Sequence, residues 1–292
     1  MSRSLLRTSL AANAVLTVPA AFGVAVLARR QWRNRRAAAQ EAQTRAAQLA
    51  LEQATNIRTC ALAAFDPVFA LDPVFGPTLA TEVRFVGRGG FHVLGGTTDF
   101  EAWILAVLAK RARCMFEFGT CTGKTTYLWA VNSEPGARVV TLTLAPEQAA
   151  AFVNEGSDNQ ARQEIATGLQ ESVCSQFLYS ETPVAGKVTQ LYGDSKEFDE
   201  TPYAGQCDLV FVDGSHEYSY VASDTAKALR MVRPGGIVLW HDYYGAHAEM
   251  GEYGVYRALN EAAAHRLLVH LEGTAIVAYR CPPDTRGPRL PA

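Results

Sequence analysis

The sequence predicts an α/β fold in which helices cover both faces of a mostly parallel β-sheet. Short apolar runs alternate with longer stretches of helical character from residue 115 onwards, an order typical of parallel strands joined by crossover helices. Only Glu272 and Gly273 separate the last two runs, so these are expected to form an antiparallel hairpin. The seven predicted strands are residues 115–118, 139–144, 188–191, 209–212, 237–241, 267–271 and 274–279.

Composition and charge limit the class of protein. A chain of 292 residues that is 48% hydrophobic and 19% charged suits one large globular domain with appendages. Residues 1–40 carry seven arginines and no acid, so the 27 basic residues of the chain leave 20 against 29 acidic ones elsewhere. Nucleic-acid binding depends on Lys and Arg side chains that neutralise phosphates. This acidic body therefore argues against a nucleic-acid substrate.

The six cysteines are scattered and form no C-x-x-C pair. Structural zinc sites and the disulfide frameworks of small secreted domains both need closely patterned cysteines. The sequence therefore predicts free thiols in a reducing compartment.

Residues 8–28 form a run of 21 uncharged residues, about long enough for a helix to cross a bilayer core. Three interpretations compete: a membrane anchor, a cleaved secretory signal and an Arg-rich organellar transit peptide. The arginines lie at the two ends of the run, which favours an anchor with its basic flank over residues 1–36. Five arginines follow the run and two precede it, so the positive-inside rule predicts a cytoplasmic body.

After the basic flank, helix-forming and helix-breaking residues divide the chain into a predicted linker helix, a Pro-containing segment and a second helix. Residues 36–65 are rich in Ala, Gln and Glu and contain no Pro or Gly, which predicts a helix, and 37–78 are interpreted as a helical linker. Two D-P-V-F repeats end it, since Pro breaks helices into turns. A helix is predicted over 100–112, capped by residues 97–99. The catalytic domain is assigned to 79–281 and a flexible tail to 282–292.

The strongest local signal is a glycine-rich turn between a predicted strand and a predicted helix. The pattern is Glu117-x-Gly119-x-x-x-Gly123, and the helix is expected from about Lys124. Glycines let a backbone approach a ligand closely, and a helix N-terminus offers N–H groups to a carboxylate or phosphate. A nucleotide-binding P-loop is the rival, because Gly123-Lys124-Thr125 matches its ending. Only three residues separate the two glycines, one fewer than that motif needs.

Ionisable residues follow two further predicted strands. Asp213 and His216 follow the run 209–212, and His241 and Asp242 end the next strand. Ligands of open α/β sheets lie at the carboxyl ends of parallel strands, so these four side chains are expected to converge. Two carboxylates with imidazoles suit a divalent ion, or a general base that removes a proton from a hydroxyl.

These motifs carry a resemblance to a known family. The run DLVFVDGSHEYSYVASDTAKALRMVRPGGIVLWHDY, followed by GVYRAL and EGTAIVAYR, is similar to bacterial class I S-adenosylmethionine (SAM)-dependent methyltransferases, in the family that includes macrolide and cephalosporin-pathway O-methyltransferases. The resemblance covers about residues 87–280. It implies a Rossmann-like fold with a seven-stranded sheet that ends in an antiparallel hairpin, preceded by N-terminal helices. It also implies O-methylation of a small-molecule hydroxyl with SAM as cofactor.

The same resemblance assigns the cofactor contacts. SAM binding falls to Glu117, Gly119, Thr120 and Gly123, and contact with the adenine region falls to Asp194. The family usually ends its second strand with an Asp that accepts hydrogen bonds from both ribose hydroxyls, whereas this chain has Thr143 there. A Thr hydroxyl accepts one such bond without charge, a loss of about 1–2 kcal/mol.

The residues at these two strand ends are also the candidates for a metal site and for a catalytic base. Asp213 and Asp242 match positions that bind Mg²⁺ in related sugar O-methyltransferases, and His241 stands where those relatives often carry an acid. The expected roles are Asp213 with Asp242 as metal ligands or acceptor-orienting pair, and His216 or His241 as base. With His241 as base, activity should rise through about pH 6.5. Two other functions stay open: a membrane-tethered pseudoenzyme, suggested by Thr143, and a P-loop-like nucleotide enzyme.

Overall fold

The computed structural model describes residues 32, 35–36, 55–89, 96–145, 147–148, 174, 176–245 and 253–284. The chain divides into two compact units, Met1–Ala54 and Thr55–Ala292. In the first unit Trp32 and Arg36 are exposed helical residues, with the guanidinium 4.6 Å from the centre of the indole ring. The apolar run 8–28 and the first part of the expected linker, 37–54, lie outside the described residues. No helix of the described part combines the length and the apolarity needed to span a membrane.

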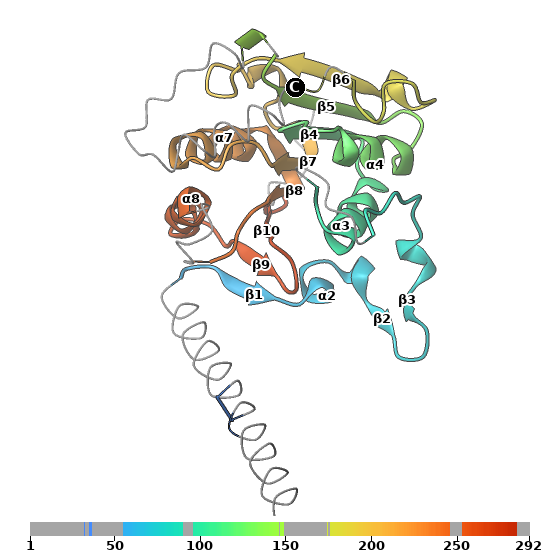
Figure 1. Ribbon diagram of the computed structural model, residues 1–292, viewed down its shortest axis with the longest axis vertical. Helices are drawn as coiled ribbons and strands as arrows, with labels where there is room; N and C mark the ends of the chain where they lie inside the picture. Colours follow the sequence, from blue (N-terminus) through green and yellow to red (C-terminus); the bar gives the residue numbers. More distant parts are fainter. Residues whose placement is uncertain are drawn as a thin grey trace, which may run out of the picture. The chain divides into compact units, whose positions relative to one another are not determined.

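The second unit is built around an eight-stranded sheet with the order β1-β9-β10-β8-β7-β4-β5-β6 (Figure 1). The strands β4 to β8 run parallel to one another, whereas β10 is antiparallel to both β8 and β9. This confirms the mostly parallel sheet that ends in an antiparallel hairpin. The strands of the sheet are β1 (Arg58–Cys60), β4 (Cys114–Phe118), β5 (Arg138–Thr143), β6 (Val188–Tyr192), β7 (Cys207–Val212), β8 (Val232–Trp240), β9 (Val269–Leu271) and β10 (Val277–Arg280).

The described helices are α2 (Leu62–Phe65), α3 (Asp99–Ala109), α4 (Lys124–Asn132), α7 (Tyr218–Met231) and α8 (Tyr253–Ala263). Short 3-10 turns occupy Pro67–Phe69, Leu79–Thr81, Ala185–Lys187 and Thr201–Tyr203, and a small hairpin joins β2 (Leu71–Asp72) to β3 (Gly76–Pro77).

Strand side chains alternate between the two faces of the sheet, and each face has its own apolar core. Met115 and Leu209 pack into the core that includes α3 and α4 residues. Their neighbours Phe116 and Val210 pack into the opposite core with residues of α7 and α8. Figure 1 shows these two helix pairs on opposite sides of the sheet. The two-residue repeat of a strand therefore produces the helix–sheet–helix layering.

The helix α3 begins with a capping box. The side chain of Thr98 accepts a hydrogen bond from the Glu101 N–H at 3.2 Å, and Glu101 Oε2 accepts one from the Thr98 N–H at 2.8 Å. These bonds satisfy two N–H groups that a helix start would otherwise leave unpaired. The cap predicted at residues 97–99 is confirmed, although the helix ends at Ala109 rather than at 112.

The helix predicted over 36–65 is wrong for Arg58–Cys60, which form strand β1. This strand pairs in parallel with β9 and brings the sheet to eight strands instead of seven. The backbone N–H of Glu272 donates to the Cys60 carbonyl at 3.0 Å. Because the partner strand lies more than 200 residues further along the chain, a local sequence pattern could not predict this pairing.

Candidate active site

The parallel strands deliver the predicted site residues to one edge of the sheet. Because β4 to β8 share one direction, their carboxyl ends lie at the same edge. Thr143 ends β5, and Asp194 follows β6 after one glycine. Asp213 directly follows β7, and His241 and Asp242 directly follow β8. The expected convergence at adjacent strand ends is therefore present.

The glycine loop between β4 and α4 packs directly against the residue after β7. Gly119 has a φ of +95°, and a Cβ there would lie 2.0 Å from the backbone oxygen of Asp213. Gly123 has a φ of +75°, and a Cβ there would come within 2.8 Å of the Tyr179 ring. Side chains are strained at such φ values and have no space at either position. Glycine at 119 lets the loop lie close against the Asp213 backbone, and glycine at 123 lets it lie close against the Tyr179 ring.

The side chains of Glu117 and Thr120 face inward beneath this loop. Glu117 is 1% exposed and accepts hydrogen bonds from the hydroxyls of Thr126 and Thr141, the latter at 2.7 Å. The hydroxyl of Thr120, which is buried as well, lies 2.8 Å from that of Thr141. Burial raises the pKa of Glu117 to about 8, although both hydroxyls oppose the shift. These two side chains therefore make hydrogen bonds within the protein that stabilise the loop. The loop backbone is the part that a ligand would contact.

Thr143 and Asp194 lie on the neighbouring strand ends. Thr143 is largely buried, and its carbonyl accepts a hydrogen bond from the Gly193 N–H at 2.9 Å. The Asp194 carboxylate accepts one from the Tyr220 hydroxyl at 2.9 Å and one from the Lys196 N–H at 2.8 Å. Both residues lie at the same edge of the sheet as the glycine loop, at the carboxyl ends of β5 and β6. Their cofactor contacts stay predictions.

Lys124 is a residue whose role the sequence did not reveal. It is the first residue of α4, whose N-cap Gly123 provides no side-chain cap. Its ammonium nitrogen is buried and has no hydrogen-bond partner among the described residues. Burial lowers the pKa of Lys124, while the charge of Asp99 opposes the shift. A buried cation without a partner is costly, and an anion at this helix start would remove that cost.

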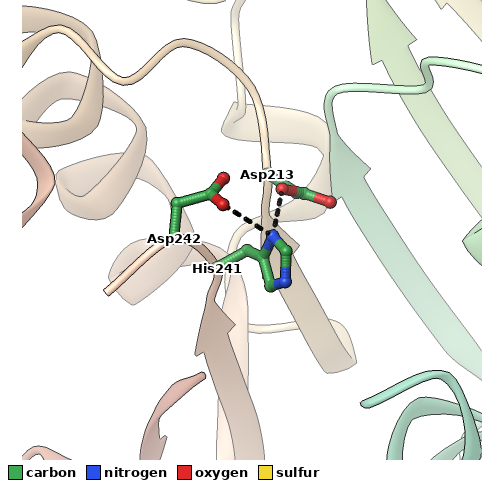
Figure 2. Close-up of side chains that lie close together, drawn as sticks. All are labelled: Asp213, His241 and Asp242. Atoms are coloured by element: carbon green, nitrogen blue, oxygen red, sulfur yellow. Dashed lines mark ion pairs between the residues drawn. The ribbon is translucent and has the colours of Figure 1, made fainter. Parts of the chain in front are cut away.

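His241 lies between three carboxylates from three elements. Its Nδ1 is 3.1 Å from Asp213 Oδ1 and 3.2 Å from Asp242 Oδ1. Figure 2 marks these two ion pairs with dashed lines. The Nε2 of His241 is 3.4 Å from Oε2 of Glu101 in α3. Glu101 was not among the predicted site residues. Its sequence signal is the T-x-x-E capping pattern, which explains the helix start but not the histidine partner.

The carboxylates hold a proton on His241. Burial alone would lower the pKa of His241, but the charges of Asp213 and Asp242 outweigh it and raise that pKa well above 6.5. Burial would likewise raise the pKa of Glu101, but the hydrogen bond and charge of His241 lower it to about 2. His241 therefore keeps its proton at neutral pH. This argues against His241 as the base and against the expected rise of activity near pH 6.5.

His216 is the more accessible imidazole of the pair. Its Nε2 lies 2.8 Å from Asp242 Oδ2, and its side chain is 37% exposed against 10% for His241. Burial would raise the pKa of Asp242, but His241 and His216 lower it below its usual range. Asp242 has a φ of +58°, a conformation uncommon outside glycine, and this backbone presents its carboxylate to both rings. An imidazole oriented by a carboxylate is the usual form of a general base.

Asp213, His241 and Asp242 also offer ligand atoms that all lie within 4.8 Å of one another. Magnesium prefers oxygen ligands, whereas imidazole nitrogen suits transition metals. His241 Nδ1 is already at hydrogen-bonding distance from both carboxylates, so its proton and a metal would compete for the same lone pair. The donor set fits a protonated His241 better than a magnesium ion.

Comparison with known proteins finds one family that part of the chain resembles. Residues 116–243, less than half of the chain, match the Methyltransf_24 family, a methyltransferase domain. No curated protein matches the chain.

Several solved structures are similar to the chain. The O-methyltransferase TomG from Streptomyces achromogenes shares 20% identity over 64% of this chain and 82% of its own, with a TM-score of 0.43. The Podospora anserina methyltransferase PaMTH1 shares 17% over 65% and 81%, with a TM-score of 0.46. Rv0187 from MTB shares 19% over 70% and 86%, with a TM-score of 0.43.

The family match begins within β4 and ends just after β8, so it contains the glycine loop and both ionisable strand ends. These are the parts of the molecule that the geometry brings to one edge. The sheet, with five parallel strands and a terminal antiparallel strand, has the class I methyltransferase topology that the sequence predicted. Residues 116–243 are therefore similar to a methyltransferase domain, and they carry the glycine loop and both ionisable strand ends.

Proposed function

We propose that the protein transfers the methyl group of SAM to a hydroxyl oxygen of a small molecule. The observation that carries this proposal is the His216–Asp242 pair, with its 2.8 Å contact, beside the glycine loop that packs on Asp213. A hydroxyl is a poor nucleophile until it loses its proton, so a positioned base is what oxygen methylation requires of the protein. The acidic body of the chain supports a small-molecule acceptor over a nucleic acid.

The proposed roles follow from the geometry of the cluster. Asp242 orients the ring of His216 through the Nε2 contact, and the imidazole takes the proton of the acceptor hydroxyl. His241, fixed in its protonated form, keeps Asp213 and Asp242 in place and supplies positive charge beside the oxygen that becomes negative. The bound sulfonium supplies an electrophilic methyl group. In-line placement of the two reactants accounts for the remaining rate enhancement.

The proposal is tested by incubating the full chain with SAM labelled in its methyl group and a panel of small hydroxyl, amine and thiol compounds. We expect labelled methyl ethers and formation of S-adenosylhomocysteine (SAH) only with hydroxyl acceptors. Label found only on nitrogen or sulfur would refute oxygen methylation. SAM binding without transfer to any compound of a broad panel would instead support the pseudoenzyme interpretation.

We propose that Lys124 holds the carboxylate of the methionyl part of SAM. The Lys124 ammonium, which is buried without a hydrogen-bond partner in the described part of the chain, lies at the start of α4, which lacks a side-chain cap. Both features favour an anion. Replacing Lys124 by Gln removes a charged hydrogen bond of about 1.5–3 kcal/mol, so the Kd for SAM should rise about 10- to 100-fold. Calorimetry measures this change.

Methylthioadenosine, which lacks the methionyl carboxylate, is the matched control ligand. Its affinity should be the same for wild type and Lys124→Gln. An equal loss of affinity for both ligands would mean that the substitution disturbs the fold and not a carboxylate contact.

Metal removal is predicted to leave activity unchanged. His241 Nδ1 lies 3.1 Å from Asp213 and 3.2 Å from Asp242, and the raised pKa of His241 favours a proton there over a metal ion. Dialysis against EDTA should therefore leave kcat within about twofold of its initial value, and added Mg²⁺ should not raise it. Loss of activity that Mg²⁺ restores would contradict this and would support the metal pair Asp213–Asp242.

We further propose that residues 8–28 anchor the protein in a membrane, with the catalytic body in the cytoplasm. The proposal rests on the 21 uncharged residues and on the five arginines that follow them. Fractionation should find the full chain in membranes and a chain starting at Thr55 in the soluble pool. A mature N-terminus near Arg29 would show cleavage and refute the anchor.

A further inference from the structure

Two cysteines meet at the edge of the sheet opposite the active site. Cys114 is the first residue of β4 and Cys207 the first residue of β7, and these strands are parallel neighbours. Their sulfur atoms are 3.9 Å apart. Cys207 is fully buried, whereas Cys114 is partly exposed. A small oxidant therefore reaches the pair through Cys114, with Cys207 directly behind it.

The surroundings of the pair favour a thiolate on the accessible sulfur. A guanidinium nitrogen of Arg138, from β5, lies 3.4 Å from Cys114 Sγ. The hydrogen bond from Cys207 and the Arg138 charge lower the pKa of Cys114 to about 6, against the effects of burial and of Asp208. The same contact and burial raise the pKa of Cys207. Since the thiolate is the reactive form, the two sulfurs differ in role.

The geometry also permits a covalent bond. The register places Cys207 one residue before the position opposite Cys114. A strand spacing of about 4.8 Å and a rise of about 3.3 Å per residue then put the two Cα atoms roughly 6 Å apart, within the roughly 4.4–6.8 Å range that disulfides bridge. The sulfurs must approach by about 2 Å to reach the usual S–S length of about 2.05 Å. Rotation of the partly exposed Cys114 side chain is the movement that requires least change in the core.

We propose that Cys114 and Cys207 form an oxidation site that peroxides convert into a disulfide. The Cys114 thiolate attacks one peroxide oxygen, so that an S–O bond forms, the O–O bond breaks and hydroxide leaves. Cys207 then attacks the sulfenic sulfur of Cys114. An S–S bond forms, the S–O bond breaks, and the Cys207 proton leaves with the hydroxide as water. The hydroxide released in the first step takes up the proton that Cys114 lost on forming its thiolate, so that two thiols are oxidised and one hydrogen peroxide is reduced to two waters.

The site is separate from methyl transfer. The two cysteines lie at the amino ends of β4 and β7, whereas the glycine loop and Asp213 lie at the carboxyl ends of the same strands. No residue of the pair is part of the proposed base or cofactor contacts. The oxidation proposal can therefore be tested independently of the proposed methyl transfer.

The test is peptide mapping of the full chain after treatment with hydrogen peroxide at neutral pH. Remaining thiols are alkylated, and trypsin then releases residues 114–124 and 197–227, the peptides that carry Cys114 and Cys207. We expect these two peptides to appear covalently joined, and to separate on reduction. Because the first peptide also contains Cys121, fragment ions must place the bond at Cys114.

Two variants complete the test. Cys114→Ser should lose the joined peptide, and Cys207→Ala should leave a sulfenic acid at Cys114 that dimedone captures. A bond to Cys121 in wild type, or over-oxidation of Cys114 without any joined peptide, would overturn the proposal. The wild-type result decides the matter even where the Cys207 variant folds poorly.

Discussion

Replacing His216 by Ala is expected to lower kcat by about 10²- to 10⁴-fold while the Kd for SAM stays within about twofold. The size of the effect is that of losing a positioned general base. His216 has this role because its ring contacts Asp242 at 2.8 Å and is the more exposed of the two imidazoles. In wild type, kcat should fall as the pH is lowered, because the base becomes protonated. The variant should lose this dependence.

His265→Ala is the matched control, since His265 is an exposed residue beyond α8. It should leave kcat and its pH profile unchanged. If His216→Ala retains kcat within about threefold of wild type, His216 is not the base. Asp213 would then be the remaining candidate at these strand ends.

Replacing Gly119 by Ala is expected to abolish measurable SAM binding and to destabilise the fold. The new Cβ would lie 2.0 Å from the Asp213 backbone oxygen, in a residue whose φ is +95°. The left-handed backbone costs about 1–2 kcal/mol and overpacking about 1–3 kcal/mol, or roughly 2–5 kcal/mol together. Urea denaturation measures the loss of stability, and calorimetry measures SAM binding.

Gly136→Ala is the control, because nothing lies within 4 Å of a Cβ at that position. It should bind SAM like wild type and unfold at the same urea concentration within error. Wild-type stability and affinity in Gly119→Ala would show that the loop can move away from Asp213. The close packing of the glycine loop against Asp213 would then not be required for stability or for SAM binding.

The sheet could be predicted because its signals are local. The strands β4 and β7 are apolar runs that end at Gly119 and Asp213, and the apolar end of β8 is followed by His241 and Asp242, so the runs place these residues at strand ends without any knowledge of tertiary contacts. Strand β1 could not be predicted in this way. Its three residues are neither strongly apolar nor alternating, and pairing with β9 alone makes them a strand.

The site could be predicted in its residues but not in its electrostatics. The side chains of Asp213, His241 and Asp242 were expected to meet, and they do. The third carboxylate, Glu101, lies 140 residues before His241 and has an evident local role as a capping residue. The pKa of His241 depends on burial and on the charges of Asp213 and Asp242, so the sequence predicted a base where the raised pKa keeps the imidazole protonated.

The role of Lys124 could not be predicted from the sequence either. Its place after Gly123 suggested a phosphate-binding loop, although the loop is one residue short of that motif. What distinguishes this lysine is the burial of its ammonium without a hydrogen-bond partner in the described part of the chain. The burial of this nitrogen depends on how the glycine loop and α4 pack, and a sequence pattern does not predict that packing.

The central claim is that the strand-end edge around Gly119 and Asp213 is a SAM site. Calorimetric titration of the full chain with SAM, SAH and ATP tests it most directly. The account predicts saturable binding of SAM and SAH at one site per chain and no binding of ATP. Binding of ATP with no heat from SAM or SAH would contradict it and would favour the nucleotide-enzyme interpretation of the glycine loop.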